Sequence, residues 1–416
     1  KAGDIKEAFA TAKTIEDADI RAEALTDIAT AQAKAGDVKA ALATAKTIED
    51  ADDRAEALAD IATAQAKAGD VKEALASAKT IEDAYDRAEA LTGIAKAQAK
   101  AGDVKKAKKT FVQAFATAKT IEDADDRALA LTDIATAQAK AGDIKEAFAT
   151  AKTIEDADIR AEALTDIATA QAKAGDVKAA LSTAKTIEDD DDRALALTDI
   201  ATAQAKAGDV KAALATAKTI EDAYYRALAL TGIATAQAKA GDVKEVKKTF
   251  VQALATAKTI EDADIRAEAL TDIATAQAKA GDVKEAKKTF VQAFATAKTI
   301  EDDDDRAEAL ADIATAQAKA GDVKAALATA KTIERTDNRA EALTGIATAQ
   351  AKAGDVKEAK ETFVQAFASA KTIEDADDRA EALTDIATAQ VKAGDIKEAF
   401  ATAKTIEDAD IRAEAL

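Results

Sequence analysis

One four-residue motif, Lys-Ala-Gly-Asp, returns twelve times along this 416-residue chain. The motif glycines lie 33 or 40 residues apart, and the residues between them are close to identical from one repeat to the next. A fixed period of roughly 20–50 residues is the signature of solenoids and related arrays. We therefore predict a single continuous array over residues 1–416 instead of several globular domains. The motif glycines are Gly3, Gly36, Gly69, Gly102, Gly142, Gly175, Gly208, Gly241, Gly281, Gly321, Gly354 and Gly394.

Each repeat predicts a pair of helices. Residues 21–35 carry apolar side chains at three- and four-residue steps up to Gly36, which can take the left-handed conformation that ends a helix. Asp37 can then cap a second helix, and Asp52 or Asp53 can cap the first helix of the next repeat. The fold class is therefore all-α, an α-solenoid of helical hairpins with 33- and 40-residue repeats.

These residues resemble the tetratricopeptide repeat family. Its pattern of small and apolar residues is met by Leu25, Ile28 and Ala29 before the glycine and by Val38 and Ala41 after it. The 40-residue repeats add an aromatic residue and an alanine three positions later, as in Phe111 with Ala114. The tryptophan, tyrosine and proline that mark the family's repeat are missing, so the chain is tetratricopeptide-like.

The resemblance implies a concave groove lined by the first helices, where the family often clamps the carboxylate of a peptide. The corresponding candidate groove residues are Thr26, Asp27, Thr30 and Lys34, together with Glu23. Clamping asparagines are absent and an aspartate stands in their midst, so a carboxylate is disfavoured as ligand. An extended, basic peptide stays open as an alternative, as does a uniform solvated face with no ligand.

The 40-residue repeats gain seven residues in the second helix, which is close to two helical turns and keeps the apolar stripe in phase. Because the first helix does not lengthen, we expect an overhang with exposed aromatic residues that mark a self-association surface. The alternative is that neighbouring long helices cover each other. The candidate self-association residues are Phe111, Val112, Phe115, Phe250, Val251, Phe290, Val291, Phe294, Phe363, Val364 and Phe367.

A hierarchy above the repeat divides the chain into blocks 1–139, 140–278 and 279–391, with a further block opening at 392–416. Because the chain begins at Lys1 without a methionine and both ends fall in mid-motif, we expect a processed chain or an excerpt of a longer array. Residues 392–416 repeat residues 1–25 letter for letter. Matching apolar ends favour head-to-tail stacking.

Composition excludes several kinds of chemistry. Histidine, cysteine and methionine are absent, which removes the usual acid/base, thiolate and haem ligands, and serine occurs only at Ser77, Ser182 and Ser369. We predict no catalysis, no cofactor and no metal. The recurring acids of Glu49 to Asp53 could suggest a calcium loop, but capping of helix N-termini accounts for them better.

Charge bears on the partners. The net charge of -20 argues against nucleic acid as a partner, and charged residues interrupt every apolar run before it could span a membrane. The short repeat 34–66 carries a net charge of -3, whereas the long repeat 100–139 carries +1, so copies of the chain could attract each other.

The primary hypothesis is a structural protein that self-assembles end to end and laterally into a filament or sheath. The alternative is an interaction scaffold that binds a peptide or protein along its groove. The compartment stays open, and we favour an extracellular or cell-surface location.

Overall fold

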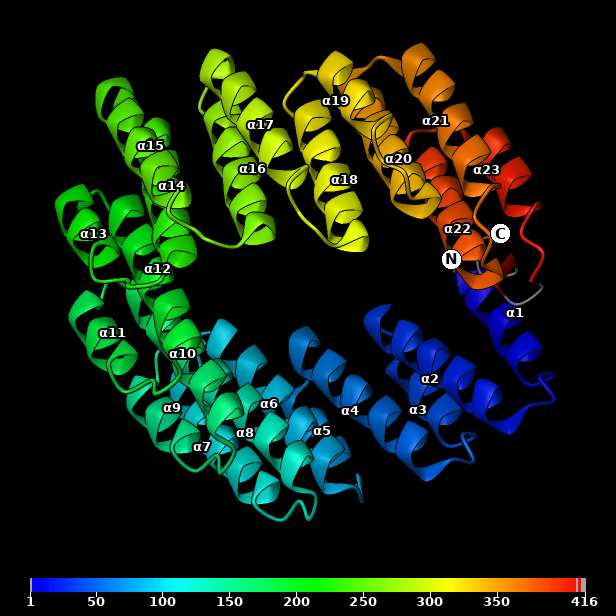
Figure 1. Cartoon of the computed structure of the whole chain (residues 1–416). Coiled ribbons are helices and arrows are strands. Elements are labelled where there is room, and N and C mark those ends of the chain that lie inside the picture. The colour runs from blue at the N-terminus through cyan, green and yellow to red at the C-terminus, as the bar shows by residue number, and fades with distance from the viewer. Residues whose placement is uncertain (1, 409–410, 413–416) are drawn as a thin grey trace. The chain divides into compact units, whose positions relative to one another are not determined.

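The computed structural model describes residues 2–408 and 411–412, and that part of the chain contains helices and no strand. It forms two compact units, unit 1 (Lys1–Ala203) and unit 2 (Gln204–Leu416) (Figure 1). Helices alternate between a first helix of 17 or 18 residues and a second helix of 8 or 15 residues. The predicted all-α solenoid of hairpins is thus confirmed. Whether the units form one continuous solenoid stays a prediction.

The first helices are α2 (Ala18–Lys34), α4 (Ala51–Ala68), α6 (Ala84–Lys100), α8 (Ala124–Lys140), α10 (Ala157–Lys173), α12 (Asp190–Lys206), α14 (Ala223–Lys239), α16 (Ala263–Lys279), α18 (Asp303–Lys319), α20 (Thr336–Ala353) and α22 (Ala376–Lys392). The short second helices are α3 (Val38–Ala45), α5 (Val71–Ala78), α9 (Ile144–Ala151), α11 (Val177–Ala184), α13 (Val210–Ala217), α19 (Val323–Ala330) and α23 (Ile396–Ala403). The long second helices are α7 (Val104–Ala118), α15 (Val243–Ala257), α17 (Val283–Ala297) and α21 (Val356–Ala370), and α1 (Ala2–Ala12) precedes α2.

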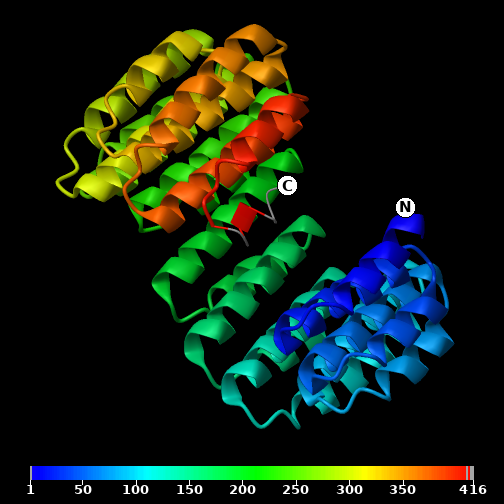
Figure 2. The same cartoon turned by 90° about the vertical axis from the view of Figure 1, so that its right-hand side faces the viewer.

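Within each unit the first helices form one layer and the second helices the other (Figure 1). Most first helices pack on the next first helix and on the second helix of their own hairpin, as α4 does on α6 and on α5. Figure 2 shows α18, α20 and α22 of unit 2 side by side. Every unit therefore has one surface made of first helices and an opposite surface made of second helices.

The ends of the helices follow from the residues of the motif. Gly36 has a φ of 88°, the left-handed conformation predicted for it, and the Asp37 side chain accepts a hydrogen bond from the Ala40 N–H. The predicted cap of the next first helix was wrong. Asp50, not Asp52 or Asp53, accepts from the first backbone N–H groups of α4, so the other two acids lie inside its first turn.

One arginine per repeat holds the loop between hairpins. The Arg54 guanidinium donates to the carbonyl oxygens of Ile48, Glu49 and Asp50 at 2.9, 3.2 and 3.2 Å. Equivalent arginines repeat this contact along the chain, as Arg226 does with Ile220. The guanidinium thereby satisfies the loop carbonyl groups of Ile48 and Glu49, whereas the Asp50 carbonyl also accepts from the Arg54 backbone N–H.

The core is built from alanines and from one isoleucine per loop. Ala41, Ala45 and Ile48 are almost fully buried, and the same positions are buried in the later repeats. A buried polar pair crosses most hairpins, as where the Thr44 hydroxyl donates to Gln32 Oε1 at 2.8 Å, but Gln65 Oε1 and Gln350 Oε1 are buried without such a partner. The glutamine that replaces the family's aromatic residue therefore pairs with the second helix instead of filling space.

Short and long repeats set different registers between successive first helices. After a short repeat, Thr30 donates to Asp60 at 2.9 Å, 30 residues further along. After a long repeat, Tyr224 donates to Glu268 at 2.7 Å, 44 residues further along. The first offset is three residues shorter than the 33-residue period, and the second is four residues longer than the 40-residue period. The insert thus slides the next first helix by about two turns, roughly 10 Å.

Each long second helix is also tied to the next repeat by an ion pair. Lys108 Nζ lies 2.7 Å from Asp143, the aspartate of the next Gly-Asp pair, and Asp143 is 5% exposed. The pair recurs in the other long repeats as Lys247 with Asp282, Lys287 with Asp322 and Lys360 with Asp395, at 3.7, 3.0 and 3.1 Å.

Candidate functional site: the acidic face of the first helices

Carboxylates of successive first helices gather on the surface that these helices form, which we call the acidic face. In unit 1, α4 and α6 enclose a hollow whose walls contain five carboxylates and one tyrosine ring. The lining residues are Asp52, Asp53, Glu56, Tyr85, Asp86 and Glu89. Among the described residues none of these five carboxylates forms an ion pair. The hollow therefore concentrates negative charge that no ion pair among the described residues neutralises.

The carboxyl groups of this hollow are harder to ionise than usual. Burial, followed by repulsion from Asp83, Glu89, Glu56 and Asp52, raises the pKa of Asp86 to about 7. Burial and neighbouring carboxylates also raise the pKa values of Asp53, Glu56 and Glu89, although Lys96 opposes the shift at Glu89. A cation placed in the hollow would relieve this repulsion.

Unit 2 carries the same face. Hollows lie between α16 and α18 and around α20, and burial raises the pKa values of Asp272, Asp312 and Glu341, with Glu268 or Asp312 as the strongest neighbouring charge. Lysines at the helix ends, such as Lys279 and Lys319, also line these hollows. No group of three or more acidic side chains in the described ranges has the arrangement of a metal site.

The predicted groove residues divide between this face and the contacts between repeats. Asp27 and Lys34 are exposed, but Thr26 is only 7% exposed and donates to the Asp53 carbonyl at 3.1 Å. Thr30 is half-buried, and its hydroxyl donates to Asp60 of the next first helix. The expectation that Thr26 is available to a ligand was wrong, since the neighbouring first helix covers it. In unit 2 the equivalents Thr271, Asp272, Thr275 and Lys279 all line one hollow.

Tyrosines on this face were missed by the sequence analysis. Tyr85 and Tyr224 occupy the same position of the first helix in two successive blocks, and Tyr224 contacts Tyr225 edge to face with ring centroids 5.4 Å apart. The 139-residue spacing between Tyr85 and Tyr224 is a signal that the sequence contained.

The predicted self-association residues fall into three classes of exposure. The expected exposure of the first aromatic residue was wrong, because Phe111, Phe250, Phe290 and Phe363 are 1 to 3% exposed. Phe115, Phe294 and Phe367 are half-buried, each with a lysine ammonium over the ring at 5.6 to 5.8 Å. The valines stay on the surface: Val112, Val251, Val291 and Val364 are 63 to 67% exposed.

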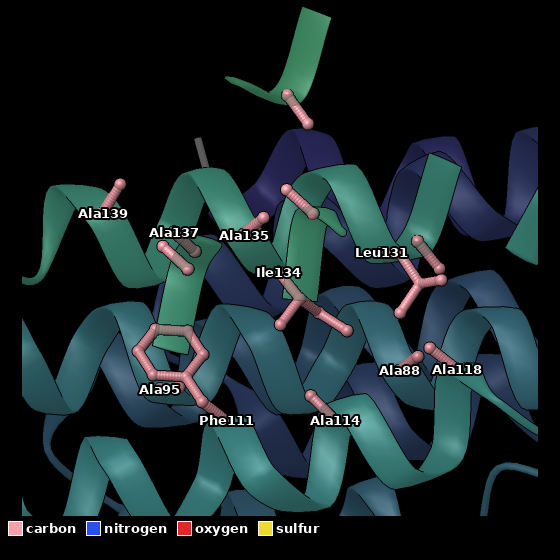
Figure 3. Packing of buried hydrophobic residues seen from close by; sticks show 14 of the residues in the cluster. Ala88, Ala95, Phe111, Ala114, Ala118, Leu131, Ile134, Ala135, Ala137 and Ala139 are labelled. Atoms are coloured by element: carbon pink, nitrogen blue, oxygen red, sulfur yellow. The ribbon is translucent and has the colours of Figure 1, made fainter. Parts of the chain in front are cut away.

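The burial of Phe111 has a simple geometric reason. The first helix α6 has 17 residues, about 25 Å, whereas a short second helix of 8 residues covers only about 12 Å of such a helix. The long helix α7, with 15 residues and about 22 Å, covers nearly all of α6 and does not overhang it. Figure 3 shows Phe111 and Ala114 of α7 pointing toward Ile134 of α8, in a cluster that includes Ala95 of α6.

The geometry of the repeat decides the fold type: two antiparallel helices joined at a left-handed glycine, with first helices stacked on first helices. The chain folds as a tetratricopeptide-like α-solenoid. No helix in the described ranges is both long and apolar enough to cross a membrane.

Comparison with known proteins gives matches among solved structures only. No family model and no curated protein matches the chain. Ton1535 from Thermococcus onnurineus NA1 is similar at 21% identity, over 87% of this chain and 98% of that one, with a TM-score of 0.29. A Rap protein complexed with competence and sporulation factor shares 15% identity over 80% and 99%, with a TM-score of 0.30. A Podosopora anserina putative kinesin light chain with nearly identical TPR-like repeats shares 21% over 53% and 100%, with a TM-score of 0.23.

The shifted carboxyl of Asp86 predicts a pH dependence of stability. Its pKa of about 7 in the folded chain exceeds the usual value of 3.8, so the folded state binds more protons than the unfolded state between these values. Its contribution to stability is full below about pH 4 and is lost as the pH rises through 7. We expect Asp86→Asn to raise the thermal midpoint at pH 8 by about 1–3 °C and to leave it unchanged at pH 4, as measured by circular dichroism. An Asp86→Asn chain no more stable than wild type at pH 8 would contradict the raised pKa.

Proposed function

We propose that this chain is a non-catalytic binding scaffold whose acidic face holds a cationic, extended polypeptide segment. The supporting observation is the row of carboxylates on successive first helices, five of which line one hollow in unit 1. Burial there, followed by repulsion from neighbouring carboxylates, raises the pKa of Asp86 to about 7. The repeated placement of the same acids suits a partner with repeated positive charges.

Charge and chemistry both favour such a partner. Lysine or arginine side chains would replace carboxylate repulsion by attraction and lower the raised pKa values. Binding near pH 6.5 would therefore release protons. The Tyr85 ring adds a surface on which a cation can rest. Because the same acids and hydroxyls recur in repeat after repeat, no single constellation is singled out for a reaction.

Titration calorimetry with octalysine tests this proposal on the full chain. We expect saturable binding at about 20 mM salt that weakens at least tenfold at about 200 mM, with proton release at pH 6.5. The variant Asp86→Asn/Glu89→Gln should weaken binding severalfold. The control Glu73→Gln/Glu146→Gln removes the same charge from exposed positions on the second helices and should change little. Equal losses in both variants, or no binding at low salt, would refute the acidic face as the site.

Self-assembly into a filament or sheath is the second candidate. The observation that favours it is the valine that each long second helix leaves on the surface, at Val112, Val251, Val291 and Val364. Electron microscopy of the purified chain at low ionic strength tests it: ordered filaments support the proposal, and separate monodisperse particles oppose it.

A further inference from the structure

We propose that a basic ridge on α7, formed by Lys105, Lys109 and Val112, docks on the acidic face of a second copy of this chain. The inference rests on the proposed function, because it uses the same face as the acceptor and names the cationic partner. The ridge belongs to the second-helix surface of unit 1, which lies opposite the first helices of that unit (Figure 1). Within unit 1 the ridge and the face therefore cannot meet, and a second copy can join them.

The ridge is an unpartnered helical face. Lys105, Lys109 and Val112 are spaced by four and three residues, so they lie on one side of α7, and all three are exposed. Lys106 is paired with Asp103 and Lys108 with Asp143, at 2.7 Å each. In the described part of the chain, Lys105 and Lys109 form no ion pair. Two lysine ammonium groups without an ion pair thus lie on the same side of α7 as Val112, whose side chain is 63% exposed.

Charge complementarity points to a copy of the chain as occupant. Helix α7 contains four lysines and no acidic residue, although the chain as a whole carries a net charge of -20. The hollow of α4 and α6 offers five carboxylates without an ion pair. Lysines of the ridge can supply the missing positive charge, and Val112 can cover apolar surface beside them.

The other long helices carry the same ridge with fewer lysines free of ion pairs, so they provide an internal control. In α15 and α17 one of the two lysines is neutralised, because Lys248 pairs with Glu245 and Lys288 with Glu285 at 2.7 Å. In α21 Glu361 stands where α7 has Lys109, and it lies 3.8 Å from Lys357. Helix α21 therefore keeps the exposed valine, Val364, but has lost the free cations. Docking driven by charge should depend on α7 and not on α21.

Sedimentation velocity of the full chain tests the ridge. We expect self-association at about 20 mM salt that disappears at about 500 mM, where the Debye length falls from roughly 20 Å to about 4 Å. The variant Lys105→Gln/Lys109→Gln should weaken association at least tenfold. The control Lys357→Glu changes the net charge by the same amount in α21 and should leave association as it is. A chain that stays monomeric at low salt, or equal effects of both variants, would overturn the inference.

A charge swap identifies the acceptor. Lys105→Glu/Lys109→Glu makes the ridge acidic, and Asp86→Lys/Glu89→Lys makes the hollow basic, so each variant alone should be monomeric. Mixing the two should restore association, and a mixture that stays monomeric would overturn the assignment. If the basic variant loses its helical circular dichroism, it is replaced by Asp86→Asn/Glu89→Gln. This neutral variant is expected to weaken self-association of the otherwise unaltered chain. Octalysine binding to a chain that never self-associates would refute the docking and leave the proposed function standing, whereas loss of both would refute the two together.

Discussion

Replacing Phe111 by alanine is expected to lower the free energy of unfolding of its repeat by about 3–5 kcal/mol. The side chain is 1% exposed and lies among the small residues of α6, α7 and α8 (Figure 3). Most residues of this cluster are alanines, whose side chains cannot move into the space, so much of the cavity would persist and add its own cost. Hydrogen exchange of residues 84–140 is the suitable measurement, because arrays of repeats can unfold locally and need not follow a two-state transition.

The adjacent residue is the matched control. Val112 is 63% exposed on the same helix, so Val112→Ala should change stability by no more than about 0.5 kcal/mol. If Phe111→Ala were as mild as Val112→Ala, the aromatic ring would not be part of the core, and the original expectation of an exposed aromatic surface would be restored.

Shortening the long helix α7 should either preserve its packing on α6 or disrupt it, depending on the number of residues removed. Deleting residues 107–113 removes seven and leaves Val-Lys-Lys-Ala-Phe-Ala-Thr-Ala, close to the Ile-Lys-Glu-Ala-Phe-Ala-Thr-Ala of the native short helix α9. Seven residues correspond to about 700° of helix, within roughly 20° of two full turns, so the apolar stripe stays in phase. We expect this chain to fold with the register of a short repeat between α6 and α8.

Deleting five residues, 109–113, is the contrasting change. It rotates the two parts of the stripe by about 140° relative to each other, which directs Ala107 and Ala114 to different sides of the helix. Packing of α7 on α6 should fail, with a loss on the order of 5 kcal/mol and fast hydrogen exchange over residues 84–140. Comparable protection of the two deletion chains would mean that the phase of the stripe does not determine how the second helix packs.

Much of the fold could be predicted from the sequence because its signals are local. A left-handed glycine, a capping aspartate and a stripe of alanines act within a few residues, so Gly36, Asp37 and Ala41 were assigned correctly from their neighbours alone. The start of α4 was misplaced because several aspartates in a row can each cap a helix, and backbone geometry chose Asp50 among them.

The candidate site was harder to predict, since it depends on which helices lie beside each other. The sequence marked Thr26 and Thr30 as surface positions of the first helix, but the offset between neighbouring first helices turns both toward the next repeat. Likewise the acids of α4 and the tyrosine of α6 lie about one repeat apart in sequence, and only their packing encloses them in one hollow. The charge of that hollow is a property of two helices together.

The sequence by itself determined that the chain is an all-α array with a break at each motif glycine from Gly36 onward, because helix period, capping and chain reversal depend on short stretches of residues. The tertiary structure alone decided that Phe111 is buried while Val112 is exposed, since that depends on how much of α6 the longer helix α7 covers. It also decided which carboxylates crowd together, because the register between helices follows from the length of the helix that connects them. Burial and electrostatic repulsion act between neighbours in space, and those neighbours exist only once the hairpins have stacked.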